Sequence, residues 1–114
     1  MRQGNNIKLS IVIPVYNEET FLEKLSFSLK KYFNEHDTEI IFINDGSTDN
    51  SLNILKKIKH KKDYSFKIKI HTHEKNFGKG KALQTGIKMA SGEYVLLQDA
   101  DLELDLKDSY EMFH

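Results

Sequence analysis

Two aspartates separated by one residue, Asp99 and Asp101, are the strongest chemical signal in the sequence. They directly follow a short apolar run that ends at Gln98. Neighbouring carboxylates repel each other unless a cation lies between them, and Mg²⁺ or Mn²⁺ prefers such oxygen ligands together with substrate phosphates. The segment therefore predicts a divalent metal site, with an acidic surface turn as the alternative.

A second segment that could do chemistry combines glycines and lysines: Asn76-Phe77-Gly78-Lys79-Gly80-Lys81. Glycines ahead of a helix let backbone N–H groups approach a phosphate. The segment matches neither of two familiar phosphate loops, because one needs glycine where Lys75 stands and the other needs glycine where Leu83 stands. It therefore indicates a helix entrance with lysines, which either contact phosphate or face solvent.

Polar turns follow two earlier apolar runs. Pro14 ends the first run because it has no N–H to donate, and Tyr16 and Glu18 follow in the turn. Helix capping and the positive end of a helix would explain the glutamate, but they do not explain a tyrosine in a polar turn. We therefore keep this turn as a candidate ligand-contacting segment.

The turn after the second run begins with Asp45-Gly46 and continues with Ser47 and Thr48. Asp-Gly favours a tight turn, and Ser47 or Thr48 is expected to cap the next helix. A structural turn explains the segment fully. As a site, Asp45 would place a carboxylate at a strand end, where it could accept a hydrogen bond from a base or ribose.

His71 and His73 lie two residues apart in a strand-like run and would share one face of that strand. Together they could ligate a metal, but no third ligand lies nearby in the sequence. We expect ordinary surface histidines at both positions.

The elements that must position these residues alternate along the chain. Four apolar runs predict strands, and stripes of helical period separate them. The strands are expected at Leu9–Val15, Glu39–Asn44, Phe66–Thr72 and Tyr94–Gln98. Such alternation predicts a mostly parallel sheet with helices on both faces, which binds ligands at the carboxyl ends of its strands. The first and fourth runs are continuously apolar and are expected to be buried on both faces.

The helical stripes comprise small and large apolar residues at intervals of three and four. They are Phe21, Leu22, Leu25, Leu29, Tyr32 and Phe33, then Leu52, Leu55 and Ile58, then Ala82, Leu83, Gly86, Ile87 and Ala90. The small residues of the last stripe should allow close packing. A further short pattern of Leu106, Tyr110 and Phe113 follows in the acidic tail.

Length and composition limit the class of protein. The 114 residues suit one domain, and 30% charged with 39% hydrophobic residues is an ordinary globular balance. The absence of cysteine excludes disulfides, thiolate metal sites and cysteine nucleophiles. The apolar runs are far shorter than a membrane span, and the first residues do not form a secretory signal. We therefore expect a cytoplasmic protein.

Charge is unevenly distributed although the chain is neutral overall. Residues 1–55 carry a net charge of −3, residues 56–92 carry +9 and residues 93–114 carry −6. A basic middle followed by an acidic end could bind a phosphate-bearing ligand beside a metal. For most of these lysines, however, a solvated helix and loop is the favoured interpretation.

Taken in order, these segments resemble the nucleotide-binding half of a family 2 glycosyltransferase with the GT-A fold. The matching segments are Ser10 to Glu19, Asn44 to Asp49, Asn76 to Gly80, Ala90 to Tyr94, and Asp99-Ala100-Asp101. Within the family, Asp99-Ala100-Asp101-Leu102-Glu103 is most similar to dolichyl- or polyprenyl-phosphate sugar synthases. The resemblance implies a three-layer α/β/α, Rossmann-like fold with a mostly parallel sheet. Residues 1–8 would be a tail, and residues 9–114 the nucleotide-sugar-binding half.

The resemblance also implies roles for individual residues. Those expected to bind the nucleotide sugar are Pro14, Tyr16, Glu18, Asp45, Gly78, Lys79, Lys81 and Asp99. Those expected to hold Mg²⁺ or Mn²⁺ are Asp99, Asp101 and Glu103. In the lipid-phosphate branch a glutamine often stands where this chain has Glu103. No residue of this chain is assigned as a catalytic base.

The implied reaction transfers a sugar from a UDP- or GDP-linked donor with inversion, and the metal neutralises the leaving diphosphate. The expected acceptor is a polyprenyl phosphate or a cell-surface glycan. Family catalytic domains continue past the Asp-x-Asp segment, so we expect a truncated half that fails to transfer sugar unaided. Membrane association through further segments and self-association through an exposed sheet edge are also expected, whereas a nucleic-acid partner is not.

Two other classes stay open at this point. A nucleotidyltransferase-like domain shares the sheet and the acidic site, but it would carry a glycine- and arginine-rich loop where this chain has Tyr16-Asn17-Glu18. A non-enzymatic phosphate- or nucleic-acid-binding module would use the basic middle segment and need no metal.

Overall fold

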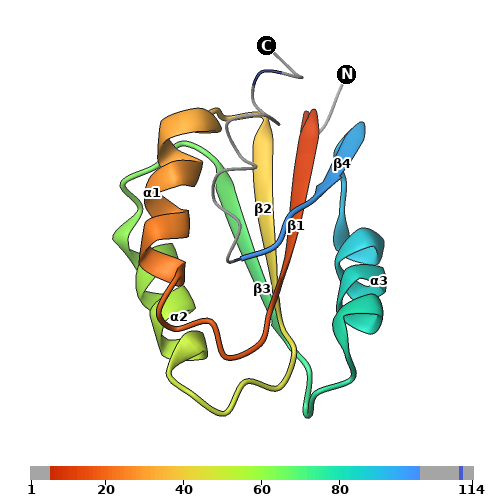
Figure 1. Ribbon diagram of the computed structural model, residues 1–114. Helices are drawn as coiled ribbons and strands as arrows, with labels where there is room; N and C mark the ends of the chain where they lie inside the picture. Colours follow the sequence, from red (N-terminus) through yellow and green to blue (C-terminus); the bar gives the residue numbers. More distant parts are fainter. Residues whose placement is uncertain (1–5, 101–110, 112–114) are drawn as a thin grey trace.

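The computed structural model describes residues 6–100 and 111, and its strands and helices alternate as the apolar pattern predicts. Figure 1 shows the elements in chain order. They are β1 (Leu9–Val15), α1 (Leu22–Tyr32), β2 (Thr38–Asn44), α2 (Ser51–Lys61), β3 (Lys67–Thr72), α3 (Lys79–Met89) and β4 (Tyr94–Leu97). The pattern of Leu106, Tyr110 and Phe113 lies outside the described residues.

The four strands form one sheet in the order β3-β2-β1-β4, and each neighbouring pair is parallel. Successive strands are added on one side from β1 to β3, and the chain then crosses back to place β4 on the other side of β1. The strand order therefore reverses between β1 and β4. In open α/β sheets such a switch point leaves a crevice at the carboxyl ends of the strands, and ligands bind there.

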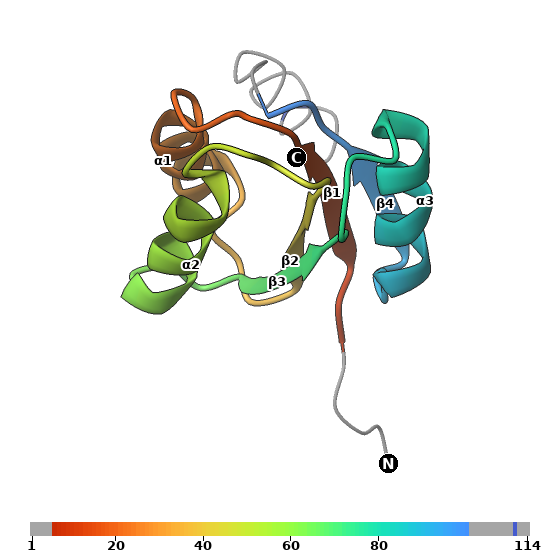
Figure 2. The same ribbon diagram turned by 90° about the horizontal axis from the view of Figure 1, so that it is seen from below.

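Helices cover both faces of the sheet, as predicted. Figure 2 shows α1 and α2 on one side and α3 on the other. The core under α1 and α2 contains large side chains of both helices and of the sheet, among them Leu25, Leu29, Phe33, Phe42 and Leu55. The core under α3 is smaller and comprises Val12, Ile41, Ile43 and Ala82. The result is the three-layer α/β arrangement expected from the sequence.

The α3 helix lies close to the sheet because it carries Gly86 at the contact. A Cβ atom at this position would overlap the side chain of Val12 in the central strand β1. The close packing expected from the small residues of this stripe is therefore present. It fixes the position of α3, and with it the position of the helix's amino end.

The exposure of β4 corrects one expectation. Tyr94, Val95 and Leu97 are 51%, 42% and 48% exposed, although their apolar run predicted burial on both faces. The reason is topological, because β4 is an edge strand of the described sheet and pairs with β1 alone. The burial predicted for the first run is confirmed in β1, where only Pro14 is half-buried; β2 is buried throughout, and both strands lie between two neighbours.

A buried polar cluster anchors the amino ends of these strands. The Glu39 carboxylate accepts hydrogen bonds from the Ser10 hydroxyl at 2.6 Å and the Ser91 N–H at 2.7 Å, and Lys69 Nζ lies 3.0 Å away. Burial alone would raise the pKa of Glu39, but the hydrogen bonds from Ser10, Ser91 and Lys69 outweigh it and lower the pKa. Gly92 donates its N–H to Ser10 and has no room for a Cβ. The Ser91-Gly92 motif therefore ties β4 to the sheet.

None of the helices within residues 6–100 is long and apolar enough to cross a membrane.

Candidate functional site

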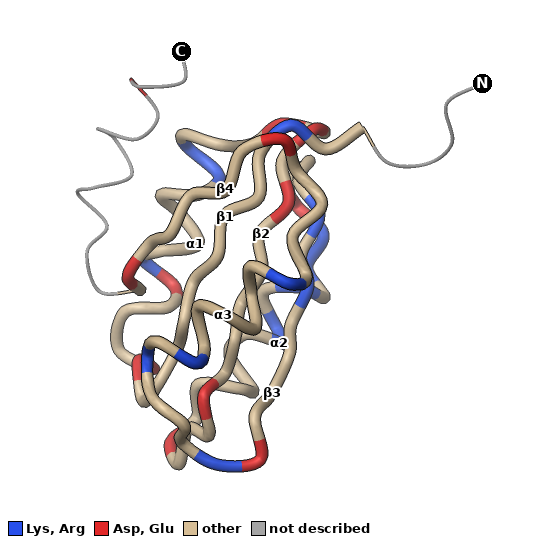
Figure 3. The backbone as a smooth tube through the Cα atoms, turned by 90° about the vertical axis from the view of Figure 1, so that its right-hand side faces the viewer, with Lys and Arg blue, Asp and Glu red and all other residues tan. Residues whose placement is uncertain are grey.

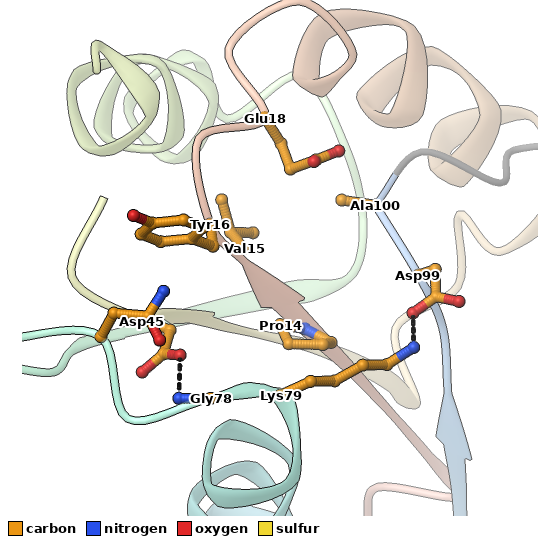
Figure 4. A pocket seen from close by; sticks show the side chains of 10 residues that line it. Pro14, Val15, Tyr16, Glu18, Asp45, Gly78, Lys79, Asp99 and Ala100 are labelled. Carbon is orange, nitrogen blue, oxygen red and sulfur yellow. Dashed lines mark hydrogen bonds and ion pairs between the residues drawn. The ribbon is translucent and has the colours of Figure 1, made fainter. Parts of the chain in front are cut away.

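A cavity of about 250 Å³ opens at the switch point, where the carboxyl ends of β1 and β4 face the amino end of α3. Figure 4 shows side chains from four loops pointing toward it. The lining residues are Pro14, Val15, Tyr16, Glu18, Asp45, Asn76, Gly78, Lys79, Asp99 and Ala100. The fold thus brings together segments that are far apart in the sequence.

The loop after β1 is held in place by Asn17, whose backbone adopts a φ of 53°. Its side-chain oxygen accepts the N–H groups of Thr48 at 2.8 Å and Asp49 at 3.2 Å, and its own N–H donates to Ser47 Oγ at 3.0 Å. The prediction that Ser47 or Thr48 caps the next helix is wrong. The α2 helix begins later, at Ser51, and both residues instead join the two loops.

Tyr16 directly precedes Asn17 in the loop that these hydrogen bonds hold. Its ring is 44% exposed and lies along the wall of the cavity, next to the residues that end β1. An exposed aromatic face beside a cavity offers a surface on which a planar ring can stack. Glu18 lies farther along the same loop and points toward Ala100 across the cavity (Figure 4).

Asp45 is almost fully buried and links three segments. Its carboxylate accepts the Gly78 N–H at 2.8 Å, the Phe77 N–H at 3.0 Å and a hydrogen bond from His73 Nδ1 at 2.7 Å. Burial would raise the pKa of Asp45, but the hydrogen bond from His73 and those from the two backbone amides outweigh it and lower the pKa. The charged carboxylate therefore organises the glycine loop, and Oδ2 keeps a second lone pair besides the one that accepts from Gly78.

Gly46 allows the loops after β2 and β3 to touch. Its φ is +71°, and a Cβ atom would overlap the backbone of Lys75 and Asn76. The chain bends at Gly46, and the close approach of two backbones explains why a glycine stands there.

An ion pair crosses one side of the cavity. Lys79, the first residue of α3, contacts Asp99 Oδ1, which follows β4 (Figure 4). The two side chains are 59% and 33% exposed, so the bond is accessible to solvent and is easily exchanged for another ion. Figure 3 shows acidic and basic residues interspersed around this end of the sheet.

The residues expected to hold a metal are described only in part. Asp99 lies at the cavity, whereas Asp101 and Glu103 lie outside the described residues. Within residues 6–100, no group of three acidic or imidazole side chains converges as a metal cage. The donor chemistry nevertheless fits Mg²⁺ or Mn²⁺, because such ions take one or two carboxylates together with substrate phosphates, and Asp99 presents a carboxylate at the cavity.

The two histidines differ from the expectation. His71 is exposed, but His73 is buried, so describing both as surface residues is wrong. His73 follows β3 directly and lies beside Asp45, which follows the neighbouring strand β2. The adjacency of these two strand ends is the signal from which burial of His73 could have been predicted. Among the described residues, no group of three metal-ligating side chains includes these two histidines.

Seven of the eight residues predicted to bind the nucleotide sugar line this cavity: Pro14, Tyr16, Glu18, Asp45, Gly78, Lys79 and Asp99. Lys81 is exposed on α3 and does not line it. Successive helix residues turn by about 100°, so Lys81 faces away from the direction of Lys79. Val15, Asn76 and Ala100 line the cavity without having been predicted. What each residue binds stays a prediction.

A crevice at the switch point of a parallel sheet is typical of the class of open α/β domains, which bind ligands at the carboxyl ends of their strands. The model of the family described as Glycosyl transferase family 2 matches residues 10–113. The chain therefore belongs to this family, as its ordered motifs predicted.

Individual relatives agree with this assignment. The chain is 41% identical over 96 residues to a poly(ribitol-phosphate) beta-glucosyltransferase of Bacillus spizizenii, covering 83% of the chain and 15% of the relative. It is 34% identical over 111 residues to a dolichyl-phosphate beta-glucosyltransferase of Dictyostelium discoideum, covering 91% and 34%. The crystal structure of Staphylococcus aureus TarS 1-349 in complex with UDP superimposes with a TM-score of 0.76 at 32% identity, covering 94% and 32%.

The chain thus spans about a third or less of the length of these proteins. The part that it shares with them is the nucleotide-sugar-transferase type of α/β fold described above.

Proposed function

We propose that this chain binds a nucleoside diphosphate sugar in the cavity at the switch point and forms the donor half of a glycosyltransferase site. The observation that carries the proposal is the convergence on one cavity of Asp45 after β2, Lys79 at the start of α3 and Asp99 after β4. Membership of the family supports it, as does the similarity of the fold to TarS, whose crystal structure is a complex with UDP.

Three of the lining residues, Tyr16, Asp45 and Lys79, each suit one part of such a ligand. The exposed ring of Tyr16 offers a stacking surface for a base, and Asp45, which lines the cavity, has a lone pair on Oδ2 that could accept a base N–H. Lys79 stands at the positive amino end of α3, where a diphosphate would gain both a charge-assisted hydrogen bond and the helix dipole. The ligand would therefore lie from β1 across to β4.

A divalent cation belongs to this proposal. Asp99, with Asp101 and Glu103, would hold Mg²⁺ or Mn²⁺, which supplies positive charge to the leaving diphosphate. Lys79 lies on the same side of the cavity and adds a second positive charge. Transfer with inversion would follow from attack on the sugar from the side opposite the diphosphate.

For the acceptor we propose a chemical class only. The names of the two relatives cover a poly(ribitol-phosphate) and a dolichyl phosphate, so phosphate-bearing polymers or lipids are the acceptors we propose. A lipid phosphate acceptor is already anionic near neutral pH and needs little help from a general base, whereas a polymer that accepts the sugar on a hydroxyl group would need one. None of the described residues is assigned that role.

Isothermal titration calorimetry tests the donor site. The chain is titrated with UDP, GDP, their sugar conjugates and duplex DNA, each with and without Mn²⁺. We expect uptake of one nucleotide class, strengthened by Mn²⁺, and no saturable uptake of DNA. Lys79→Gln should weaken uptake, whereas Lys88→Gln, at an exposed position of the same helix, should not. Salt-sensitive DNA binding without nucleotide uptake would contradict the proposal and favour the nucleic-acid alternative.

A further inference from the structure

Lys79 and Asp99 form an ion pair across one side of the cavity, and both side chains extend from anchored backbone. Lys79 Nζ contacts Asp99 Oδ1, and Figure 4 shows the two side chains pointing toward each other. Lys79 begins α3 directly after Gly78, whose N–H donates to a buried carboxylate at 2.8 Å. Asp99 directly follows Gln98, whose N–H donates to the Val12 carbonyl at 3.0 Å. The sheet and α3 therefore determine that these two charges face each other.

This ion pair involves the carboxylate that the expected metal site needs. Asp99 is the one residue of the expected metal-binding set that lies within the described residues, and it lines the cavity. A divalent cation brought to Asp99 while Lys79 stays in place would lie beside a second positive charge, which repels it. Metal binding at Asp99 is therefore favoured by a Lys79 side chain that has turned away.

The exposure of Lys79 allows this movement. The side chains of Lys79 and Asp99 are 59% and 33% exposed, so water can solvate both charges when the pair opens. A lysine side chain carries a compact ammonium group on a flexible stem of four carbons. Lys79 also stands at the positive amino end of α3, where a diphosphate is proposed to bind. A diphosphate carries more negative charge than one carboxylate and is the stronger partner for the ammonium group.

We propose that Lys79 exchanges partners: it pairs with Asp99 in the nucleotide-free chain and moves to the diphosphate when a nucleotide binds, which frees Asp99 for Mg²⁺ or Mn²⁺. The inference rests on the function proposed above and adds a dependence to it. Lys79 weakens metal binding in the empty cavity and no longer does so once the nucleotide is present. Such coupling is reciprocal, so the metal and the nucleotide strengthen each other's binding by the same factor.

The size of the effect follows from the exposure of the pair. Exposed ion pairs contribute little, so Lys79→Gln should raise the Mn²⁺ affinity of the nucleotide-free chain by about two- to fivefold. With the nucleotide bound, Lys79 has already left Asp99, so the same substitution should bring no such gain. The exchange thus predicts a gain in one condition and none in the other.

Titration with Mn²⁺ alone tests the competition without any nucleotide. Electron paramagnetic resonance measures the free Mn²⁺, and broadening of the Ala100 amide signal in nuclear magnetic resonance shows that the bound ion lies at the cavity. Lys79→Gln should raise the affinity, whereas Lys81→Gln should not, because Lys81 lies in the same turn of α3 but does not line the cavity. Unchanged affinity in Lys79→Gln, equal gains in both variants, or no Mn²⁺ near Ala100 in any of them would overturn the inference.

A double-mutant comparison tests whether the effect passes through Asp99. Asp99→Asn should weaken Mn²⁺ binding, and Lys79→Gln added to it should change the affinity little further, because the ion pair is already lost. An equal gain from Lys79→Gln in both backgrounds would show that Lys79 acts by general repulsion, and would overturn the exchange.

The nucleotide arm of the experiment uses UDP and GDP. At a saturating concentration of whichever nucleotide binds, Mn²⁺ affinity should not rise in Lys79→Gln. A gain as large as that of the nucleotide-free chain would overturn the movement of Lys79 to the diphosphate. Absence of UDP and GDP uptake, with and without Mn²⁺, would instead contradict the proposed function and with it that movement. The titration with Mn²⁺ alone would then still decide whether Lys79 competes with a metal for Asp99.

Discussion

The Asp45 carboxylate accepts the backbone N–H of Gly78 at 2.8 Å and thereby joins the end of β2 to the first turn of α3. The bond matters because Gly78 directly precedes Lys79, the residue that reaches across the cavity to Asp99. A buried charge in one loop thus sets the position of the cation in another. Small changes at Asp45 should therefore affect both stability and ligand binding.

Asp45→Asn should destabilise the fold by about 2–3 kcal/mol, because the amide group that replaces one carboxylate oxygen would face N–H donors and leave buried groups unpaired. Urea unfolding followed by circular dichroism measures this change. Asp63→Asn is the matched control, because the Asp63 side chain is half exposed and its ion pair with Lys30 lies at the surface. The control should unfold close to the wild type, and equal losses for both variants would show that Asp45 is not a buried anchor.

Acid should weaken the fold through Glu39. Its folded pKa lies below the ordinary 4.5, because the hydrogen bonds that it accepts outweigh the effect of burial. The stabilisation is therefore present above about pH 4.5 and disappears as the pH falls through the folded pKa. The free energy of unfolding of the wild type should approach that of Glu39→Gln on acidification. Glu93→Gln, at an exposed position, should follow the wild type at every pH. A constant gap between wild type and Glu39→Gln would exclude this linkage.

Gly46→Ala should cost at least about 2 kcal/mol, because the positive φ and the overlap with the Lys75 backbone both oppose a side chain. Gly80→Ala makes the same chemical change inside α3, where a Cβ meets no atom within 4 Å. That variant should stabilise the chain by up to about 1 kcal/mol, because alanine favours a helix. Melting temperatures compare the two, and shifts in the same direction would contradict the assignment of Gly46.

Lys79→Gln should weaken nucleotide binding by about tenfold or more, the usual effect of losing a charge-assisted hydrogen bond. The difference from the wild type should shrink as salt is added, because Lys79 is largely exposed and its charge is screened. Calorimetry at low and high ionic strength provides the measurement, with Lys88→Gln as the control. A salt-independent loss would indicate that the substitution distorts the loop instead of removing a charge.

Much of the fold follows from the sequence, because the signals are local. The apolar run from Leu9 to Val15 becomes β1 over the same residues, and Pro14 lies near its end. Parallel strands bring their carboxyl ends to one edge, so the polar turns after them had to lie near each other. This reasoning is enough to place Tyr16, Asp45 and Asp99 around one cavity.

The missing details depend on tertiary contacts that no local pattern encodes. Burial of His73 requires α3 to cross the sheet and bring Thr85 to its ring. Exposure of β4 depends on its place at the edge, and an apolar run looks the same at the edge as in the centre. Ser47 does not cap the helix, because its hydroxyl oxygen accepts a hydrogen bond from the Asn17 N–H in another loop.

The pairing of β4 with β1 has a consequence for how the chain folds. This ladder joins segments near the two ends of the described chain, and its closure costs more chain entropy than pairing β1 with β2. We expect β4 to dock late, after the helical layer of α1 and α2 has formed on the first two strands. The contact between Lys79 and Asp99 would then be completed only in the last step, so an intermediate would have secondary structure before it could hold a ligand.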